Sequence, residues 1–99
     1  MTSVNVVTEK QLMQEVTRLA RRAGWKIYHT WRSDNSPAGF PDLVMVKGER
    51  LIFAELKREL GRPTPEQSEW LKALSLVPGV EVYIFCPQDR EEYEEVLSR

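Results

Sequence analysis

Three residues in the middle of the chain have the types and spacing of a catalytic cluster. Asp42 follows a proline directly, and Glu55 and Lys57 stand two residues apart. Side chains alternate across a strand, so Glu55 and Lys57 are expected on one face. Neighbouring carboxylates repel unless a cation lies between them, and hard divalent ions such as Mg²⁺ or Mn²⁺ prefer oxygen ligands. The pattern therefore predicts a divalent metal site, where the metal would lower the pKa of a bound water.

The elements around these residues predict that they meet. Leu43–Val46 and Leu51–Leu56 are short apolar runs joined by a glycine-containing turn, the pattern of a β-hairpin. In an antiparallel hairpin the start of one strand lies beside the end of the other, so we expect Asp42 next to Glu55. The backbone carbonyl of Leu56 could add another oxygen to the metal.

Three further side chains are candidates for the same site. Lys57 could orient the nucleophile or offset charge that develops on a phosphate. Glu15 lies on the rim of the apolar stripe of a predicted helix, from which a carboxylate can reach inward. Gln67 stands at the third position of another predicted helix and could turn toward the cluster.

The rest of the pattern predicts a small α/β domain. Capping residues, apolar periodicity and Gly or Pro stops place its elements. Their order is α-β-β-β-α-β-α, which one central mixed sheet flanked by helices would bury. Residues 1–7 show no clear periodicity and could be a loose arm or a short edge strand. We expect helices over 8–23, 64–77 and from 89 onward, and strands over 25–31, 43–46, 51–56 and 80–86.

Composition limits the class of protein. The 99 residues allow one domain, 1–99, and 14 Lys+Arg nearly balance 15 Asp+Glu, unlike a disordered tail or a wholly basic DNA-coating protein. A single cysteine, Cys86, excludes an internal disulfide and a cysteine-rich zinc cage. No apolar run suits a membrane span, and the N-terminus lacks a signal-peptide profile. A cytoplasmic location is therefore expected.

Charge is distributed unevenly along the chain. Residues 18–32 hold five basic side chains and no acidic one, whereas residues 89–99 hold five acidic side chains and two basic ones. A basic stripe suits a protein that binds phosphates with one face, although a solvated helix face is the plainer interpretation. Candidate DNA contacts are Arg18, Arg22, Arg32, Ser33, Arg58 and Arg62.

The motifs together resemble the VRR-NUC family, a branch of the PD-(D/E)xK nuclease superfamily. The resemblance rests on Gly39-Phe40-Pro41-Asp42-Leu43, Glu55-Leu56-Lys57 and the downstream Gln67, and it runs from about Gln11 to about Cys86. It implies a restriction-endonuclease-like core and hydrolysis of DNA phosphodiesters with Mg²⁺ or Mn²⁺. Small free-standing members come from phages and bacteria and resemble Holliday-junction resolvases, which act as homodimers on branched DNA. The expected compartment is therefore a bacterial cell or a phage-infected host.

The resemblance also implies roles by position. Glu15, Asp42 and Glu55 would be acidic metal ligands, of which Glu15 has no tight motif around it. Lys57 would be the catalytic lysine, and Gln67 the family's glutamine in or near the site.

Each candidate also has a structural interpretation. Glu55 and Lys57 could be an exposed ion pair, and Asp42 could serve the turn after Pro41. Glu15 could be a solvated helix residue, and Gln67 only a capping-box partner. For the function of the domain as a whole there are two alternatives. One is a catalytically silent module on the same fold that binds nucleic acid or a partner, and the other is a sequence-specific restriction-type nuclease.

Aromatic residues have two interpretations as well. Trp25, His29 and Trp31 alternate along one predicted strand face, so we expect His29 to be packed, with a DNA contact as the alternative. Trp70 has helical spacing with apolar neighbours, which favours the core or a dimer surface over a base-stacking role.

Overall fold

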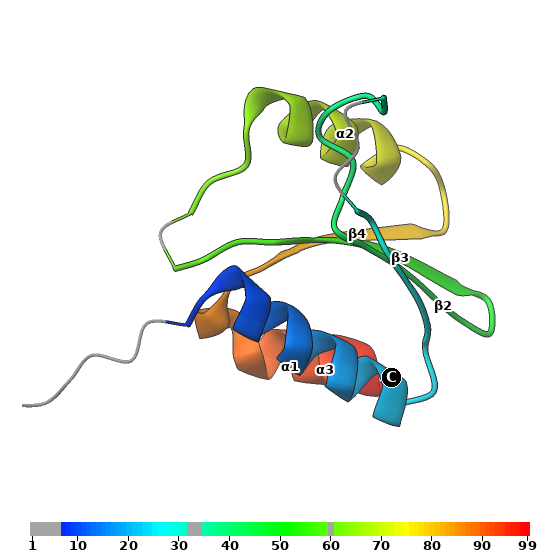
Figure 1. Cartoon of the computed structure of the whole chain (residues 1–99). Helices are drawn as coiled ribbons and strands as arrows, with labels where there is room; N and C mark the ends of the chain where they lie inside the picture. The colour runs from blue at the N-terminus through cyan, green and yellow to red at the C-terminus, as the bar shows by residue number, and fades with distance from the viewer. Residues whose placement is uncertain (1–6, 32–34, 60) are drawn as a thin grey trace, which may run out of the picture.

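A four-stranded mixed sheet runs through the middle of the molecule, with helices on both faces (Figure 1). The computed structural model describes residues 7–31, 35–59 and 61–99. The strands lie in the order β1-β2-β3-β4, with β1–β2 and β2–β3 antiparallel and β3–β4 parallel. They are β1 (Lys26–His29), β2 (Leu43–Lys47), β3 (Arg50–Leu56) and β4 (Val80–Phe85). The predicted mixed sheet and hairpin are confirmed.

Within the described ranges, three α-helices cover the sheet. They are α1 (Glu9–Arg22), α2 (Pro65–Ser75) and α3 (Arg90–Ser98), the last preceded by the 3₁₀ turn η1 (Pro87–Asp89). Helix α2 connects the parallel strands β3 and β4 across one face, and α1 and α3 lie side by side on the other (Figure 1). This confirms the predicted order α-β-β-β-α-β-α. None of these helices is long and apolar enough to cross a membrane, over the residues the structure describes.

Capping residues set where the helices begin. The Gln11 N–H donates to the Thr8 hydroxyl at 3.1 Å, and the Thr8 N–H donates to the Gln11 side chain at 2.9 Å, as the capping box predicts. Asp89 precedes α3, but its carboxylate accepts the Cys86 N–H at 2.9 Å. Helix α3 therefore begins directly after Asp89, in line with the helix expected from residue 89 onward, while the Asp89 carboxylate serves the 3₁₀ turn.

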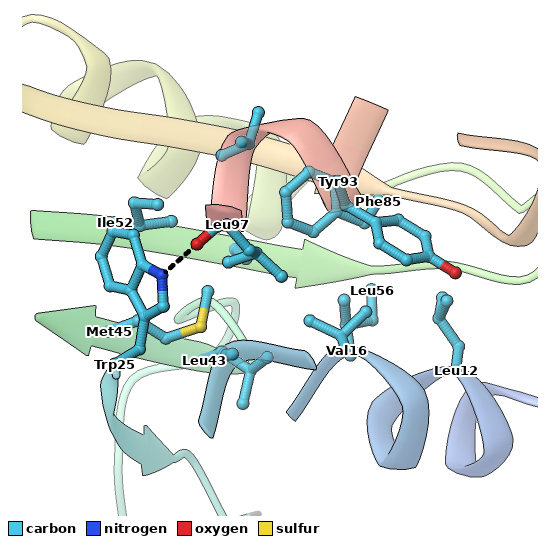
Figure 2. Packing of buried hydrophobic residues seen from close by; sticks show 13 residues of the cluster. Leu12, Val16, Trp25, Leu43, Met45, Ile52, Leu56, Phe85, Tyr93 and Leu97 are labelled. Carbon is cyan, nitrogen blue, oxygen red and sulfur yellow. Dashed lines mark hydrogen bonds between the residues drawn. The ribbon is translucent and has the colours of Figure 1, made fainter. Parts of the chain in front are cut away.

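The main core lies between the sheet and the α1–α3 layer (Figure 2). The indole Nε1 of Trp25 donates to the Leu97 carbonyl at 2.7 Å, which joins the start of β1 to the end of α3. Arg50 lies 4.8 Å from the Trp25 ring centroid and donates to the Val96 carbonyl at 3.0 Å. Core side chains on the two helices are Leu12, Val16, Ala20, Tyr93, Val96 and Leu97.

The predicted strand over 25–31 is too long. β1 ends at His29, and although Trp25 is buried, Trp31 is 76% exposed. The partner strand β2 begins only at Leu43, two residues after Pro41. Trp31 therefore lies beyond the regular part of the sheet.

Candidate active site

Asp42 is held by bonds to both neighbouring strands. Its backbone carbonyl accepts the Thr30 N–H at 2.9 Å, and its side-chain Oδ2 accepts the Leu56 N–H at 2.8 Å. The β2–β3 register continues to place Glu55 opposite Asp42, and opposite residues share a face of the sheet. The structure thus brings these two predicted site residues together at the end of β3.

Glu55 is a buried carboxylate with one oxygen that has no hydrogen-bond partner. Its side chain lies 3.1 Å from the Lys57 Nζ through Oε2 and is 2% exposed, whereas Oε1 is buried with no hydrogen-bond partner. Burial and, next, the charge of Asp42 raise the pKa of Glu55, the Lys57 ammonium opposes both effects, and the net result is a pKa of about 7. A cation at Oε1 would compensate this carboxylate.

The backbone at Leu56 supplies a further oxygen. By the strand register Pro41 stands opposite Leu56, and a proline has no N–H to donate to the Leu56 carbonyl. The Leu56 N–H is satisfied by the Asp42 side chain, and the next amide, Lys57 N–H, donates to Phe85 at 3.0 Å. The proline of the Pro-Asp motif therefore removes the ladder partner of a carbonyl beside both carboxylates.

The donor set fits a hard divalent cation. Asp42, Glu55 and the Leu56 carbonyl are all oxygen donors, and Mg²⁺ keeps several waters beside one or two carboxylates. The described residues contain no group of three or more His, Cys, Asp or Glu side chains arranged to hold a metal ion. The protein thus offers a partial oxygen shell, which water and a substrate phosphate would complete.

Glu15 is occupied elsewhere. Its Oε2 accepts a hydrogen bond from the buried Tyr93 hydroxyl, and its Oε1 lies 2.7 Å from the Arg90 guanidinium. Both partners belong to α3, so these contacts tie α1 to α3. The structure does not bring Glu15 to Asp42 and Glu55, and its role as a metal ligand stays a prediction.

Gln67 forms the capping box of α2. Its Oε1 accepts the Thr64 N–H at 2.8 Å, and its own N–H donates to the Thr64 hydroxyl at 3.2 Å. The side-chain oxygen of Gln67 is therefore a capping-box partner, the structural role considered for this residue. Any part of Gln67 in catalysis would fall to its side-chain NH₂ group, and that role stays a prediction.

The loop before Asp42 packs against the start of α2 through Gly39. A Cβ there would lie 2.5 Å from the Glu66 carbonyl carbon, and the φ of Gly39 is +96°, so only glycine fits without strain. The next ring, Phe40, packs edge-to-face on Trp70 and Phe53, at 5.1 and 5.9 Å between centroids. The Gly-Phe-Pro-Asp segment thus positions the site, and Trp70 anchors this loop.

Four of the six predicted DNA contacts lie in two described segments of the chain. Arg18 and Arg22 are exposed on α1, and Arg58 and Arg62 are exposed in the segment after Lys57. Arg32 and Ser33 lie outside the described residues.

Sequence reasoning missed Thr30. Its Oγ1, together with Glu55 Oε1, is one of two buried side-chain polar atoms without a hydrogen-bond partner across the described ranges. Thr30 pairs with Asp42 through the backbone, so both orphaned oxygens belong to residues that neighbour Asp42. Strand alternation alone could not find Thr30, because its pairing with Asp42 depends on the register across a loop.

Comparison with known proteins supports the fold. No protein-family model matches the sequence, and no curated protein matches it significantly. The structure is similar to a VRR_NUC domain protein, with a TM-score of 0.69 and 20% identity over 93% of this chain and 92% of that one. It is also similar to Hjc of Archaeoglobus fulgidus, a Holliday junction resolvase, with a TM-score of 0.51 and 24% identity over 81% of this chain and 66% of that one. The expected restriction-endonuclease-like α/β fold, and the resemblance to VRR-NUC at the level of the fold, are confirmed.

Proposed function

We propose that this 99-residue domain is a divalent-metal-dependent endonuclease that hydrolyses DNA phosphodiester bonds and prefers branched DNA. The observation that carries the proposal is the buried Glu55, whose unpartnered oxygen lies beside Asp42 while its other oxygen pairs with Lys57 at 3.1 Å. A purely structural ion pair would not need a second carboxylate next to it. The fold shared with a VRR_NUC domain protein and a Holliday junction resolvase supports the same assignment.

Asp42, Glu55 and the Leu56 carbonyl would hold Mg²⁺ or Mn²⁺, and Glu15 would join them only by exchanging its bonds to Tyr93 and Arg90. The ion, when bound, supplies a Lewis acid that lowers the pKa of water and polarises the phosphate. The Leu56 N–H keeps the Asp42 carboxylate in place for this work.

Lys57 would act directly on the reacting groups. The Lys57 side chain is 12% exposed and its ammonium is held beside Glu55, so it would donate to the attacking water or to a phosphate oxygen from a fixed position. The Thr30 hydroxyl and the Gln67 NH₂ group are further donors that the phosphate could use.

DNA binding would involve arginines that precede and follow the site residues along the chain. Arg58 and Arg62 follow Lys57 along the chain, and Arg18, Arg22, Arg32 and Ser33 are proposed to extend the contact. A homodimer is proposed because one protomer has one site, whereas paired cuts across a junction need two.

A cleavage assay tests the proposal. Labelled four-way junction DNA is incubated with protein and Mn²⁺, and matched linear duplex and single strands are tested in parallel. The proteins are wild type, Lys57→Ala and the control Lys72→Ala, which changes an exposed lysine of α2. We expect wild type and Lys72→Ala to cut the junction, and Lys57→Ala to lose about 10²–10³-fold in rate while staying folded. Unchanged cleavage by Lys57→Ala would overturn the site.

The substrate controls separate the finer claims. Paired nicks confined to the junction support a dimeric, branch-specific enzyme. Equal cutting of every substrate keeps the nuclease and removes the branch preference. No cutting by folded, metal-bound protein would favour the silent binding module.

A further inference from the structure

A large aromatic side chain stands in solvent at the end of β1. Trp31 is 76% exposed, although exposed tryptophan is uncommon in a small domain. Its ring contacts the half-buried His29 ring at 4.6 Å between centroids, tilted by 37°. The indole is therefore supported from one side and open to solvent elsewhere, which is the arrangement of a platform.

The platform lies at the same end of the sheet as the proposed active site, where β1 and β3 end and β2 begins. Trp31 directly follows Thr30, whose N–H donates to the Asp42 carbonyl at 2.9 Å. Consecutive Cα atoms are about 3.8 Å apart, so the Trp31 Cα lies about that far from the Cα of Thr30, the residue paired with Asp42. β1 is also an edge strand of the sheet, with β2 on one side only, so Trp31 follows an edge strand.

We infer that Trp31, supported by His29, stacks on an unpaired nucleobase of the DNA strand whose phosphate lies at Asp42 and Glu55. This inference rests on the proposed function and adds a determinant of substrate choice. Every nucleobase has a flat π-face, and a base–aromatic stack needs no particular sequence. Bases inside a continuous duplex already stack on both neighbours, whereas bases at a branch or in a displaced strand have a face to offer. The ring would therefore favour branched over continuous DNA.

The competing occupant is another protein surface, such as a second copy of the chain. A nucleobase is favoured because the ring stands at the same end of the sheet as the residues proposed to hold the phosphate, and a strand bound there carries its bases past this end. Leu76, at the end of α2, provides a matched control because it is 74% exposed and also apolar.

The experiment measures stacking and affinity together. A four-way junction carries 2-aminopurine at the branch, and a linear duplex carries it between paired bases. Ca²⁺ replaces Mn²⁺, and a gel checks that the DNA is intact. Wild type, Trp31→Ala, Trp31→Phe and Leu76→Ala are compared by fluorescence titration and by light scattering.

We expect wild type to quench the fluorescence of 2-aminopurine at the branch and Trp31→Ala to leave this fluorescence unquenched. Trp31→Ala should bind the junction about 5- to 100-fold more weakly, with duplex affinity little changed, and Trp31→Phe should restore part of the loss. Leu76→Ala should match wild type. Equal quenching and affinity in Trp31→Ala would overturn the stacking role while leaving the nuclease intact.

Two other outcomes would also overturn it. Weaker self-association of Trp31→Ala with unchanged DNA binding would assign the ring to a protein contact. Failure of wild type to bind any of the DNAs would remove the proposed function, and the stacking role with it.

Discussion

The Asp42 carboxylate accepts the Leu56 N–H at 2.8 Å across the β2–β3 pair, where a regular ladder would use a backbone carbonyl. Pro41 stands opposite Leu56, and the side chain of the next residue supplies the contact there. One aspartate thus completes the sheet and presents charge to the site.

This dual role predicts different results for two substitutions of Asp42. Asp42→Asn keeps an oxygen acceptor for Leu56 and removes the charge beside Glu55, so we expect stability at or above wild type. Asp42→Ala leaves the Leu56 N–H without its partner and should cost about 1–3 kcal/mol of unfolding free energy. Both variants should lose cleavage. Urea denaturation and the junction assay measure the two effects, and equal stability of the two variants would contradict the dual role.

The buried Glu55 predicts a fold that is more stable without this charge. Its folded pKa of about 7 lies above the ordinary 4.5, so protonation favours folding and stability falls as the pH rises from about 4.5 through 7. Without metal at pH 8, Glu55→Gln should therefore be more stable than wild type by roughly 2–3 kcal/mol. Mg²⁺ should raise the Tm of wild type and leave Glu55→Gln unchanged.

The matched control is Glu69→Gln, an exposed glutamate of α2. It should behave as wild type with and without Mg²⁺. A Glu55→Gln variant that is less stable than wild type at pH 8, or that gains the same Tm from Mg²⁺, would show that this carboxylate is not the cation's partner.

The close approach at Gly39 predicts a large cost for one added methyl group. Gly39 and Gly79 both have positive φ, +96° and +81°, but a Cβ at Gly79 meets nothing within 4 Å. We expect Gly39→Ala to lose about 1–3 kcal/mol more than Gly79→Ala, because its Cβ meets the backbone of α2. Cleavage should also slow, since this loop positions Asp42. Thermal denaturation and initial rates test this, and equal losses in both variants would contradict it.

The Arg50–Glu81 pair predicts an acid-sensitive part of the fold's stability. Arg50 donates to both Glu81 oxygens, at 2.8 and 2.7 Å, and this contact holds the Glu81 pKa below its ordinary 4.5. A lowered folded pKa gives stability that is present above about 4.5 and is lost as the pH falls through the folded value. Glu81→Gln should therefore cost about 1 kcal/mol at pH 7 and little at pH 3.

Denaturation at several pH values measures this difference. Glu94→Gln, which breaks an exposed pair with Arg90, is the control and should change stability less. A Glu81→Gln cost that does not depend on pH would mean that packing, not charge, is what the substitution removes.

The hairpin and its acidic residues were predictable because their signals are local. Two apolar runs and a glycine turn set the strands, and antiparallel geometry then places Asp42 beside Glu55 without further information. The resemblance to a known nuclease family rested on the same segment and on the downstream Gln67.

Residues whose partners are distant in sequence were beyond this reasoning. Glu15 contacts Tyr93 across 78 positions, and that contact follows from how α1 packs on α3. The Thr30–Asp42 pairing depends on how a loop closes between β1 and β2. Alternation likewise put Trp31 on a buried face, since no local signal marks where β1 ends.

The bond from Trp25 to the Leu97 carbonyl also constrains when the protein folds during synthesis. These residues are 72 positions apart, and Tyr93 and Leu97 complete the same core. The hydrophobic centre therefore cannot close until residue 97 has left the ribosome. Until then the apolar side chains of α1 and the hairpin that α3 covers in the folded domain remain exposed to other contacts.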